Sequence, residues 1–223
     1  MSKITLYYTI TSPPSRGVIL ASKALGVDLQ LKNVDMSKGE HLTPEFLQLN
    51  PQHTVPVIND NGVIVFESHA IVAYLWEKYA NESSLYSFDN FQRARINALL
   101  HFDTGYLFRH FDHLYYEIYD YGATDVPQKT VKNLKKCWAI MENFLANGNF
   151  LCGNEMCIAD ISCIATLTSV DSFSPIDSAT YPKLVEWVKT MKALPFYEHN
   201  KNGAELVQKI MWEKMEANKT AAK

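Results

Sequence analysis

The sequence has little net charge, no long hydrophobic run and few cysteines. Its formal net charge is −3, and acidic and basic residues are mixed along the chain. It therefore lacks the basic patch typical of a nucleic-acid-binding protein. No apolar run reaches the roughly 18 residues of a membrane-spanning helix, so we expect no membrane span. The first eight residues show no signal-peptide core or cleavage site, so we expect a cytoplasmic protein.

The four cysteines do not form a pattern that binds metal. Cys137, Cys152, Cys157 and Cys163 include no C-x-x-C pair, and cysteine and histidine are not clustered at zinc spacing. We therefore expect reduced, mostly buried thiols and no metal.

Hydrophobic residues make up 47% of the 223 residues, enough for one large core or two smaller ones. The pattern changes near residue 80. Before it, alternation and turn residues predict an α/β domain, with strands at 4–8, 29–34, 55–58 and 63–66 and helices at 14–25, 43–49 and 68–79. After the polar connector 81–88, the spacing predicts only helices, at 90–119, 126–146, 158–170, 182–194 and 204–216. We expect residues 219–223 to be disordered.

Three short motifs lie at the ends of successive predicted elements. Ser12 precedes two prolines, which is typical of a capped helix start. A helix N-terminus also offers unpaired N–H groups and a positive dipole end, and these would favour a thiolate there. Ser12 is therefore either a cap or a donor to a substrate sulfur.

The second motif is His53-Thr54-Val55-Pro56. A proline cannot donate within a sheet, so either the strand begins at Pro56 on an edge, or the Val55–Pro56 bond is cis. The cis alternative leaves the Val55 backbone free to pair with an extended ligand.

The third motif is Glu67-Ser68-His69, where a strand meets a helix. Ser68 is either a plain N-cap or part of a polar pocket. In that pocket Glu67 would take an ammonium group, and Ser68 with the helix N-terminus would take a carboxylate. A thiolate site, a peptide-pairing site and an amino-acid site together fit the three parts of glutathione.

The sequence resembles the cytosolic glutathione S-transferases, most closely the insect epsilon class, with the delta class as a near neighbour. The resemblance is carried in order by Ser12–Pro14, Asn50–Pro56, Glu67–Ile71, His101-Phe102 and Ile158–Asp160, over essentially the whole chain. It implies a thioredoxin-like N-terminal domain (1–80), a linker (81–88), an all-α C-terminal helical domain (89–223) that forms the hydrophobic-substrate site, and a homodimer.

The resemblance also implies roles for individual residues. Ser12 would stabilise the glutathione thiolate. The other glutathione-binding residues would be His41, His53, Thr54, Val55, Pro56, Glu67, Ser68 and His69. A hydrophobic electrophile would be the second substrate, and glutathione the co-substrate.

The first long predicted helix carries a mostly aromatic stripe, comprising Thr104, Phe108, Phe111, Tyr115 and Tyr119. This region holds four tyrosines, Tyr115, Tyr116, Tyr119 and Tyr121, and so many phenols suit a cleft with polar tips better than a dry core. We therefore expect the hydrophobic substrate to contact Pro14, Met36, Phe108, Phe111, Asp112, Tyr115, Tyr116 and Tyr119.

Two residues depart from the family pattern. Asp112 stands near a position where many epsilon-class relatives carry a basic residue, and an acid there could hydrogen-bond a hydroxylated ligand. Cys157 stands where the family usually places Ser or Thr as a helix cap.

Several functions remain open at this stage. The leading hypothesis is conjugation of glutathione to hydrophobic electrophiles, as in detoxification of xenobiotics and insecticides. The alternatives are a glutathione-dependent isomerase, dehydrochlorinase or peroxidase acting on a steroid-like or lipid substrate, a non-catalytic carrier, and an interaction module of translation complexes. Tyr7 and Tyr8 are rivals to Ser12, because other classes place a catalytic tyrosine at the end of the first strand.

Overall fold

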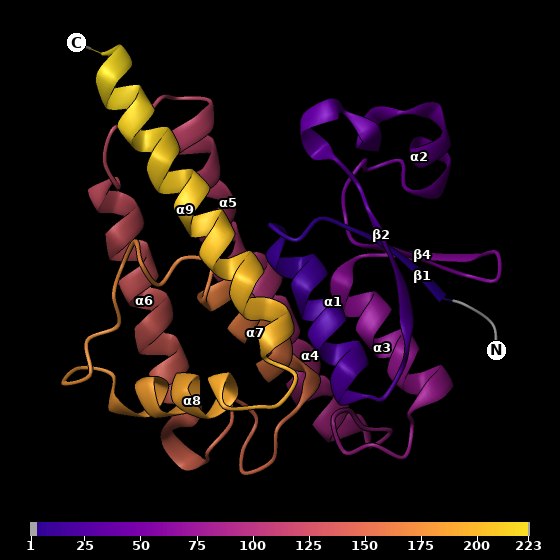
Figure 1. Cartoon of the computed structure of the whole chain (residues 1–223). Coiled ribbons are helices and arrows are strands. Elements are labelled where there is room, and N and C mark those ends of the chain that lie inside the picture. Colours follow the sequence, from indigo (N-terminus) through magenta and orange to yellow (C-terminus); the bar gives the residue numbers. More distant parts are fainter. Residues whose placement is uncertain (1–3, 223) are drawn as a thin grey trace.

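The computed structural model describes residues 4–222, in which a small α/β domain packs beside a larger group of helices (Figure 1). The elements of the first domain are β1 (Ile4–Tyr8), α1 (Pro13–Ala24), β2 (Leu29–Asn33), the short 3-10 helices η1 (Met36–Lys38) and η2 (Glu40–Leu42), α2 (Pro44–Leu49), β3 (Val57–Asp60), β4 (Val63–Phe66) and α3 (Ser68–Tyr79).

The four strands form one sheet in the order β2-β1-β3-β4, with β1 parallel to β2 and β3 antiparallel to both of its neighbours. Alternation along β1 sends Ile4 and Leu6 into the core shared with α1 and α3. Tyr7 faces the other side and meets Phe46 of α2 edge-on, with ring centroids 6.2 Å apart. This three-layer unit is the thioredoxin-like domain that the resemblance implies, and that prediction is confirmed.

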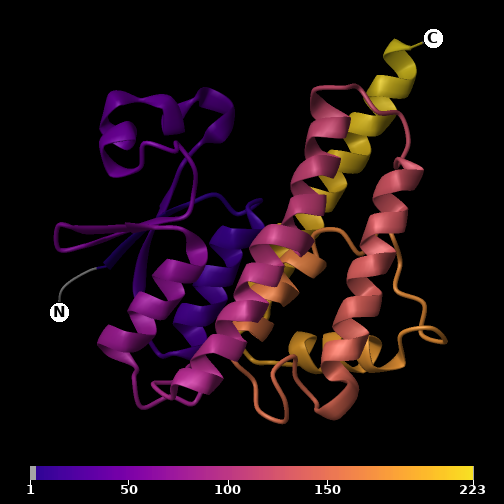
Figure 2. The ribbon, with the colours of Figure 1, turned by 180° about the vertical axis from the view of Figure 1, so that it is seen from behind.

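The second part of the chain is helical (Figure 2). Its elements are α4 (Asn90–Phe102), a π-helical turn η3 (Asp103–Leu107), α5 (Phe108–Tyr119), α6 (Gln128–Phe144), the 3-10 turn η4 (Leu145–Asn147), α7 (Ile158–Leu167), α8 (Pro182–Lys192) and α9 (Glu198–Ala221). Within residues 4–222 no strand follows β4, and the only further pairing is the isolated bridge between Phe150 and Gly153. No described helix is both long and apolar enough to cross a membrane.

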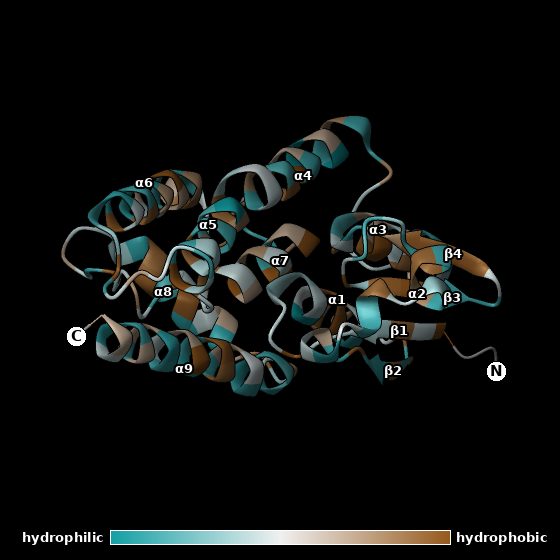
Figure 3. Cartoon of the chain, turned by 90° about the horizontal axis from the view of Figure 1, so that it is seen from above, coloured by the Kyte–Doolittle hydropathy of each residue, from teal (hydrophilic) through white to brown (hydrophobic). Residues whose placement is uncertain are grey.

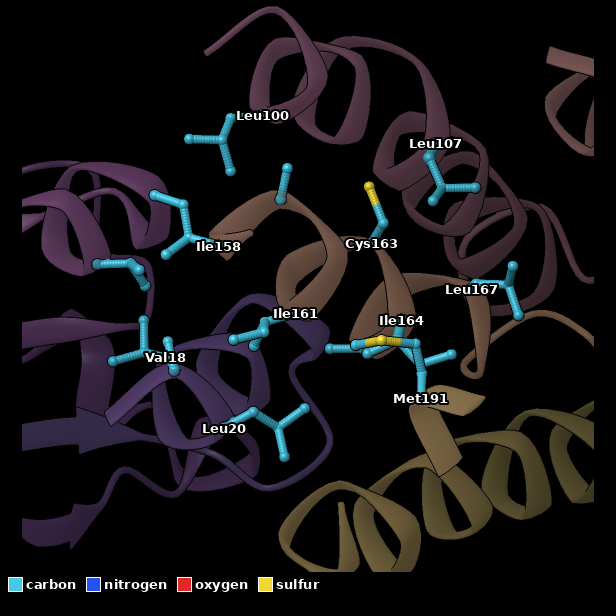
Figure 4. Close-up of a cluster of buried hydrophobic side chains, with 14 of the residues drawn as sticks. Val18, Leu20, Leu100, Leu107, Ile158, Ile161, Cys163, Ile164, Leu167 and Met191 are labelled. Carbon is cyan, nitrogen blue, oxygen red and sulfur yellow. The ribbon is translucent and has the colours of Figure 1, made fainter. Parts of the chain in front are cut away.

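Helix α7 is the centre of the molecule, and every one of its residues is buried. Figure 4 shows Ile161 and Ile164 between Val18 and Leu20 of α1 and the surrounding helices. One hydrophobic core therefore runs through both parts of the chain. The outer helices α6 and α9 alternate hydrophilic and hydrophobic residues along their length, which is typical of helices that bury one face (Figure 3).

Three local predictions differ in detail from the structure. The third strand begins at Val57 rather than Val55, because Pro56 has no N–H to donate within the sheet. The segment 90–119 is helical throughout, as predicted, but the π-helical turn divides it into α4 and α5. The end of the chain is ordered in α9 as far as Ala221, and residue 223 lies outside the described residues.

The last turns of α9 are held by the end of α5. The side chain of Asn218 donates to the backbone oxygens of Ile118 and Ala123, over 2.8 and 3.0 Å. Lys219 also pairs with Asp125 at 3.5 Å. These contacts come from residues about a hundred positions away, so the composition of the tail alone could not predict them.

Candidate functional site

A cavity of about 240 Å³ lies where the first turns of α1 and α3 meet the segment η3–α5. All three sequence motifs contribute to it. Its lining residues are Ser12, Pro14, Thr54, Val55, Pro56, Glu67, Ser68, His69, Asp103, Thr104, Phe108 and Asp112.

Ser12 is the N-cap of α1. Its backbone is extended (φ −80°, ψ 115°), and its hydroxyl oxygen accepts a hydrogen bond of 3.2 Å from the backbone N–H of Ser15. Within residues 4–222 no acceptor takes the hydroxyl proton, and the side chain lines the cavity. The cap and the donor to a ligand are therefore compatible roles, because one uses the oxygen lone pair and the other the proton.

The start of α1 has no unpaired backbone N–H in its first turn. Pro13 and Pro14 carry no N–H. The N–H of Ser15 is bonded to Ser12, and that of Arg16 to the Ser12 carbonyl. The expectation of unpaired N–H groups at this helix was therefore wrong. The remaining sources of stabilisation for an anion are the Ser12 hydroxyl and the helix dipole.

The loop before β3 presents a free backbone at Val55. The Val55–Pro56 bond is cis, as one of the two alternatives predicted. The buried side chain of Asn50 holds the loop by donating to the carbonyl and the hydroxyl of Thr54, both at 3.0 Å. The N–H and C=O of Val55 have no hydrogen-bond partner among residues 4–222, so both can pair with an extended ligand.

The start of α3 differs from the start of α1 in its capping. Its N-cap is Glu67 and not Ser68, which is the first helical residue, so the prediction of Ser68 as the cap was wrong. No side chain among residues 4–222 caps this helix, and its first amides remain available to a carboxylate. Glu67 adopts φ 68°, a conformation that residues other than glycine rarely adopt outside functional sites.

His69 and Asp103 join α3 to the π-helical turn. One ring nitrogen of His69 lies 3.0 Å from Oδ2 of Asp103, and the other lies 3.0 Å from the hydroxyl of Thr104. The second oxygen of Asp103, Oδ1, is buried and has no partner among residues 4–222. Because buried polar atoms are nearly always paired, this oxygen is a candidate acceptor for a ligand in the cavity.

Asp103 was not among the residues predicted from the sequence. A sequence signal was nevertheless present, because the apolar residues Leu99 and Leu107 lie four positions before and after it, and the structure shows that both are buried. An acid on the buried face of a helix is rare unless it is paired or functional.

Comparison with known proteins assigns the chain to a family. Residues 2–77 match the family described as glutathione S-transferase, N-terminal domain, and residues 109–196 match glutathione S-transferase, C-terminal domain. Glutathione S-transferase 1 of Manduca sexta is 35% identical over 95% of this chain and 99% of its own length. The chain belongs to the glutathione S-transferase family.

Two solved structures of this family agree with the fold. An epsilon-class glutathione S-transferase from the housefly, Musca domestica, has a TM-score of 0.92 and 36% identity, covering 95% of this chain and 98% of that one. A glutathione transferase homologue from Drosophila mojavensis, solved with bound glutathione, has a TM-score of 0.92 and 36% identity, covering 96% and 98%. The predicted resemblance to the glutathione S-transferases is therefore confirmed, and this chain is an enzyme of that family.

Other predicted site residues lie outside the cavity of this transferase. The rings of His41 and His53 are 6.1 Å apart, and Nδ1 of His41 is buried without a partner in the part of the chain described. Met36 is exposed on η1, and Tyr7 and Tyr8 are not among the lining residues.

The aromatic residues of α5 do not all face the cavity. Phe108 lines the cavity, whereas Phe111, 5.6 Å away between ring centroids, is buried in the core. Tyr115 and Tyr119 stack at 4.4 Å, and burial raises the pKa of both phenols. Tyr116 is exposed beside them.

Asp112 does line the cavity of this transferase. Burial raises the pKa of its carboxyl group, and the neighbouring charge of His113 opposes that change only in part. Within residues 4–222 no group of three or more His, Cys, Asp or Glu side chains is arranged to hold a metal ion. The site offers hydroxyl, backbone and carboxylate groups around a partly apolar wall, which suits binding of a peptide-like thiol beside an apolar molecule.

Proposed function

We propose that the enzyme transfers the thiolate of reduced glutathione to hydrophobic electrophiles, with xenobiotics such as insecticides as the substrate class. One observation carries this proposal. The Ser12 hydroxyl, whose proton has no acceptor among residues 4–222, lines the same cavity as the Val55 backbone and the start of α3, which have no hydrogen-bond partner and no side-chain cap in that range. We further propose a cytoplasmic homodimer, following the family resemblance.

Each part of glutathione has a candidate partner in this cavity. The Ser12 hydroxyl donates to the sulfur, and the Val55 N–H and C=O pair with the cysteinyl backbone. The amides of α3 and the Ser68 hydroxyl take the γ-glutamyl carboxylate, and Glu67 with Asp103 takes its ammonium group. The remaining proposed contacts are those of Thr54, Pro56 and His69 within the cavity and of His41 and His53 toward the glycyl end.

The electrophile is proposed to lie against Pro14 and Phe108, beside the position of the sulfur. Binding the electrophile beside the ionised thiol lowers the entropic cost of the reaction, because the two reacting groups are already close together. Met36, Phe111, Tyr115, Tyr116 and Tyr119 remain candidates for contact with larger substrates.

The test is the pH dependence of the ultraviolet thiolate absorbance of bound glutathione. A hydrogen bond to a charged group contributes about 1.5–3 kcal/mol, so Ser12→Ala should raise the thiol pKa by about 1–2 units. Tyr8→Phe is the matched control and should leave that pKa unchanged. If Ser12→Ala lowers only the melting temperature, Ser12 is a cap and not a catalytic residue.

A second experiment tests the proposed ammonium site. Asp103→Asn keeps the shape and the contact with His69 but removes the negative charge next to the unpartnered oxygen. We expect the KM for glutathione to rise about tenfold or more, from the loss of a charge-assisted hydrogen bond. Asp28→Asn is the control, because Asp28 is fully exposed and distant in the chain. An unchanged KM in Asp103→Asn contradicts this assignment.

Asp112 favours a second candidate function, glutathione-dependent isomerisation of a steroid-like, hydroxylated substrate. Its carboxyl group lines the cavity, and a carboxyl group there can hydrogen-bond a ligand hydroxyl. Under this hypothesis a hydroxylated steroid inhibits the wild type more strongly than its deoxy analogue, and Asp112→Leu abolishes the difference. Equal inhibition by the two ligands in the wild type excludes this role.

A further inference from the structure

Two cysteines lie near the start of α7, outside the cavity described above. Cys152 lies on a tight turn in which Phe150 and Gly153 exchange backbone hydrogen bonds of 2.8 and 3.1 Å. Cys157 is the N-cap of α7, and its thiol lies 3.2 Å from Oδ2 of Asp160. The carboxylate of Asp160 accepts hydrogen bonds of 2.9 Å from the backbone N–H groups of Leu151 and Cys157. It therefore holds the turn that carries Cys152 beside the start of α7, and both cysteines line one surface pocket.

The two thiols differ in chemistry. The neighbouring Cys157 side chain and the positive charge of Arg95 lower the pKa of Cys152 to about 7, against the opposing effects of burial and of the Asp160 charge. The Cys152 side chain, burial and the Asp160 charge raise the pKa of Cys157. A large fraction of Cys152 is therefore thiolate at neutral pH, whereas Cys157, whose thiol donates to Oδ2 of Asp160, is protonated.

Access also distinguishes this pair from the other two cysteines. Cys152 and Cys157 line a surface pocket of about 380 Å³, together with Tyr86, Gln92 and Met156. Cys137 and Cys163 are fully buried, and burial raises the pKa of both thiols, that of Cys137 to about 12. Reagents from solvent therefore meet Cys152 first.

We propose that Cys152 and Cys157 form a thiol-modification site that reacts with small disulfides such as glutathione disulfide, with Cys152 as the attacking thiol and Cys157 as the resolving thiol. The site is separate from the Ser12 cavity, so it does not depend on the proposed transferase mechanism.

The reaction balances in two exchange steps. The Cys152 thiolate attacks one sulfur of glutathione disulfide, the S–S bond breaks, and one glutathione leaves as a thiolate that takes a proton from solvent. Cys157 then gives its proton to solvent, and its sulfur attacks the Cys152 sulfur and releases the second glutathione. Two protein thiols are oxidised to one disulfide, and glutathione disulfide is reduced to two molecules of glutathione.

The experiment treats the reduced full chain with glutathione disulfide at pH 7.5, quenches with acid, alkylates the remaining thiols and maps the products by mass spectrometry. We expect the wild type to lose two hydrogen atoms and to yield one peptide that links Cys152 to Cys157. Cys137→Ser is the control and should behave as the wild type, because that thiol is buried.

Two variants separate the roles of the thiols. Cys157→Ser, which keeps a preferred N-cap residue, should stop at the mixed disulfide with one glutathione on Cys152. Cys152→Ser should gain no glutathione and form no bridge. In the wild type, iodoacetamide at pH 7 should label Cys152 at least about tenfold faster than Cys137 or Cys163.

Three results overturn the proposal. The first is a wild type that keeps all of its thiols free in glutathione disulfide. The second is modification of Cys152→Ser to the same extent as the wild type. The third is a wild type that carries glutathione on Cys152 without the bridge, which removes the resolving role of Cys157. The wild-type peptide map alone decides the first and third results, so the proposal stays testable even if a variant fails to fold.

Discussion

The side-chain nitrogen Nε of Arg16 donates a hydrogen bond of 2.8 Å to Oδ1 of Asn200, and both side chains are completely buried. The same guanidinium donates to the backbone oxygens of Ile10 and Ala165 and to the hydroxyl of Ser169. Burial lowers the pKa of Arg16 to about 9, so the group is still charged at neutral pH. One cation therefore joins α1, α7 and α9 directly behind the start of α1.

Removing one acceptor from this cation should destabilise the whole fold. We expect Asn200→Ala to lower the free energy of unfolding by about 1–3 kcal/mol, because a buried charged donor loses its partner. Equilibrium unfolding in urea measures this change. Asn202→Ala, on an exposed position of α9, is the matched control and should stay within about 0.5 kcal/mol of the wild type. Equal stability of the two variants would show that water replaces the acceptor.

The two prolines at the start of α1 make a second prediction possible. Because Pro14 has no N–H, Pro14→Ala adds a donor at the second helical position, where the residue lines the cavity. A helix N-terminus stabilises an anion by about 0.3–1 kcal/mol, which corresponds to about 0.2–0.7 pKa unit. Pro14→Ala should therefore lower the pKa of the bound glutathione thiol by that amount, whether Ser12 is present or replaced by alanine.

Thiolate absorbance against pH gives this value directly. Pro13→Ala is the control, because Pro13 lies in the same turn but does not line the cavity. If both alanine variants shift the thiol pKa equally, the change reflects the helix start in general and not a new donor at the sulfur.

Much of this arrangement could be predicted from sequence, because it depends on local spacing. Alternation predicted both ends of the strand Ile4–Tyr8 correctly. Helical spacing predicted the first residues of α7 and α8, Ile158 and Pro182. The motifs at Ser12 and Val55 were found for the same reason, since each is a local signal at the end of an element.

The remaining features depend on partners that are distant in the chain. Asp103 is paired with His69, 34 residues earlier, and no local pattern in the sequence announces that contact. The cap of α3 was misplaced because propensity favours Ser68, whereas the backbone turns at Glu67 with a positive φ. Local propensity is a weak guide where a functional site constrains the backbone.

The carboxyl group of Asp112 predicts a dependence of stability on pH. Burial raises the pKa of this carboxyl group in the folded state above its pKa in the unfolded state. At pH values between these two pKa values, the folded protein therefore binds more protons than the unfolded protein. The contribution of Asp112 to stability therefore falls as pH rises through that range. Asp112→Asn does not titrate, and its gain in melting temperature over the wild type should be larger at pH 7.5 than at pH 4.5. A gain that is equal at both pH values, or larger at pH 4.5, is incompatible with this shift.

Cys157 predicts a stabilising substitution. The backbone N–H of Cys157 donates to Oδ2 of Asp160 over 2.9 Å, so one half of a capping box is complete. The other half uses a thiol as the acceptor of the Asp160 N–H, and sulfur accepts weakly. We expect Cys157→Thr to raise the free energy of unfolding by about 0.5–1 kcal/mol, measured in urea.

Cys163→Thr is the control for this substitution. It makes the same chemical change in the buried interior of α7, where no cap is needed, and it should lower stability by about 1 kcal/mol. If both variants are destabilised, the extra methyl group of threonine outweighs the better cap. If Cys157→Thr is stabilised and Cys163→Thr is destabilised, the weak thiol acceptor at position 157 limits the stability of α7.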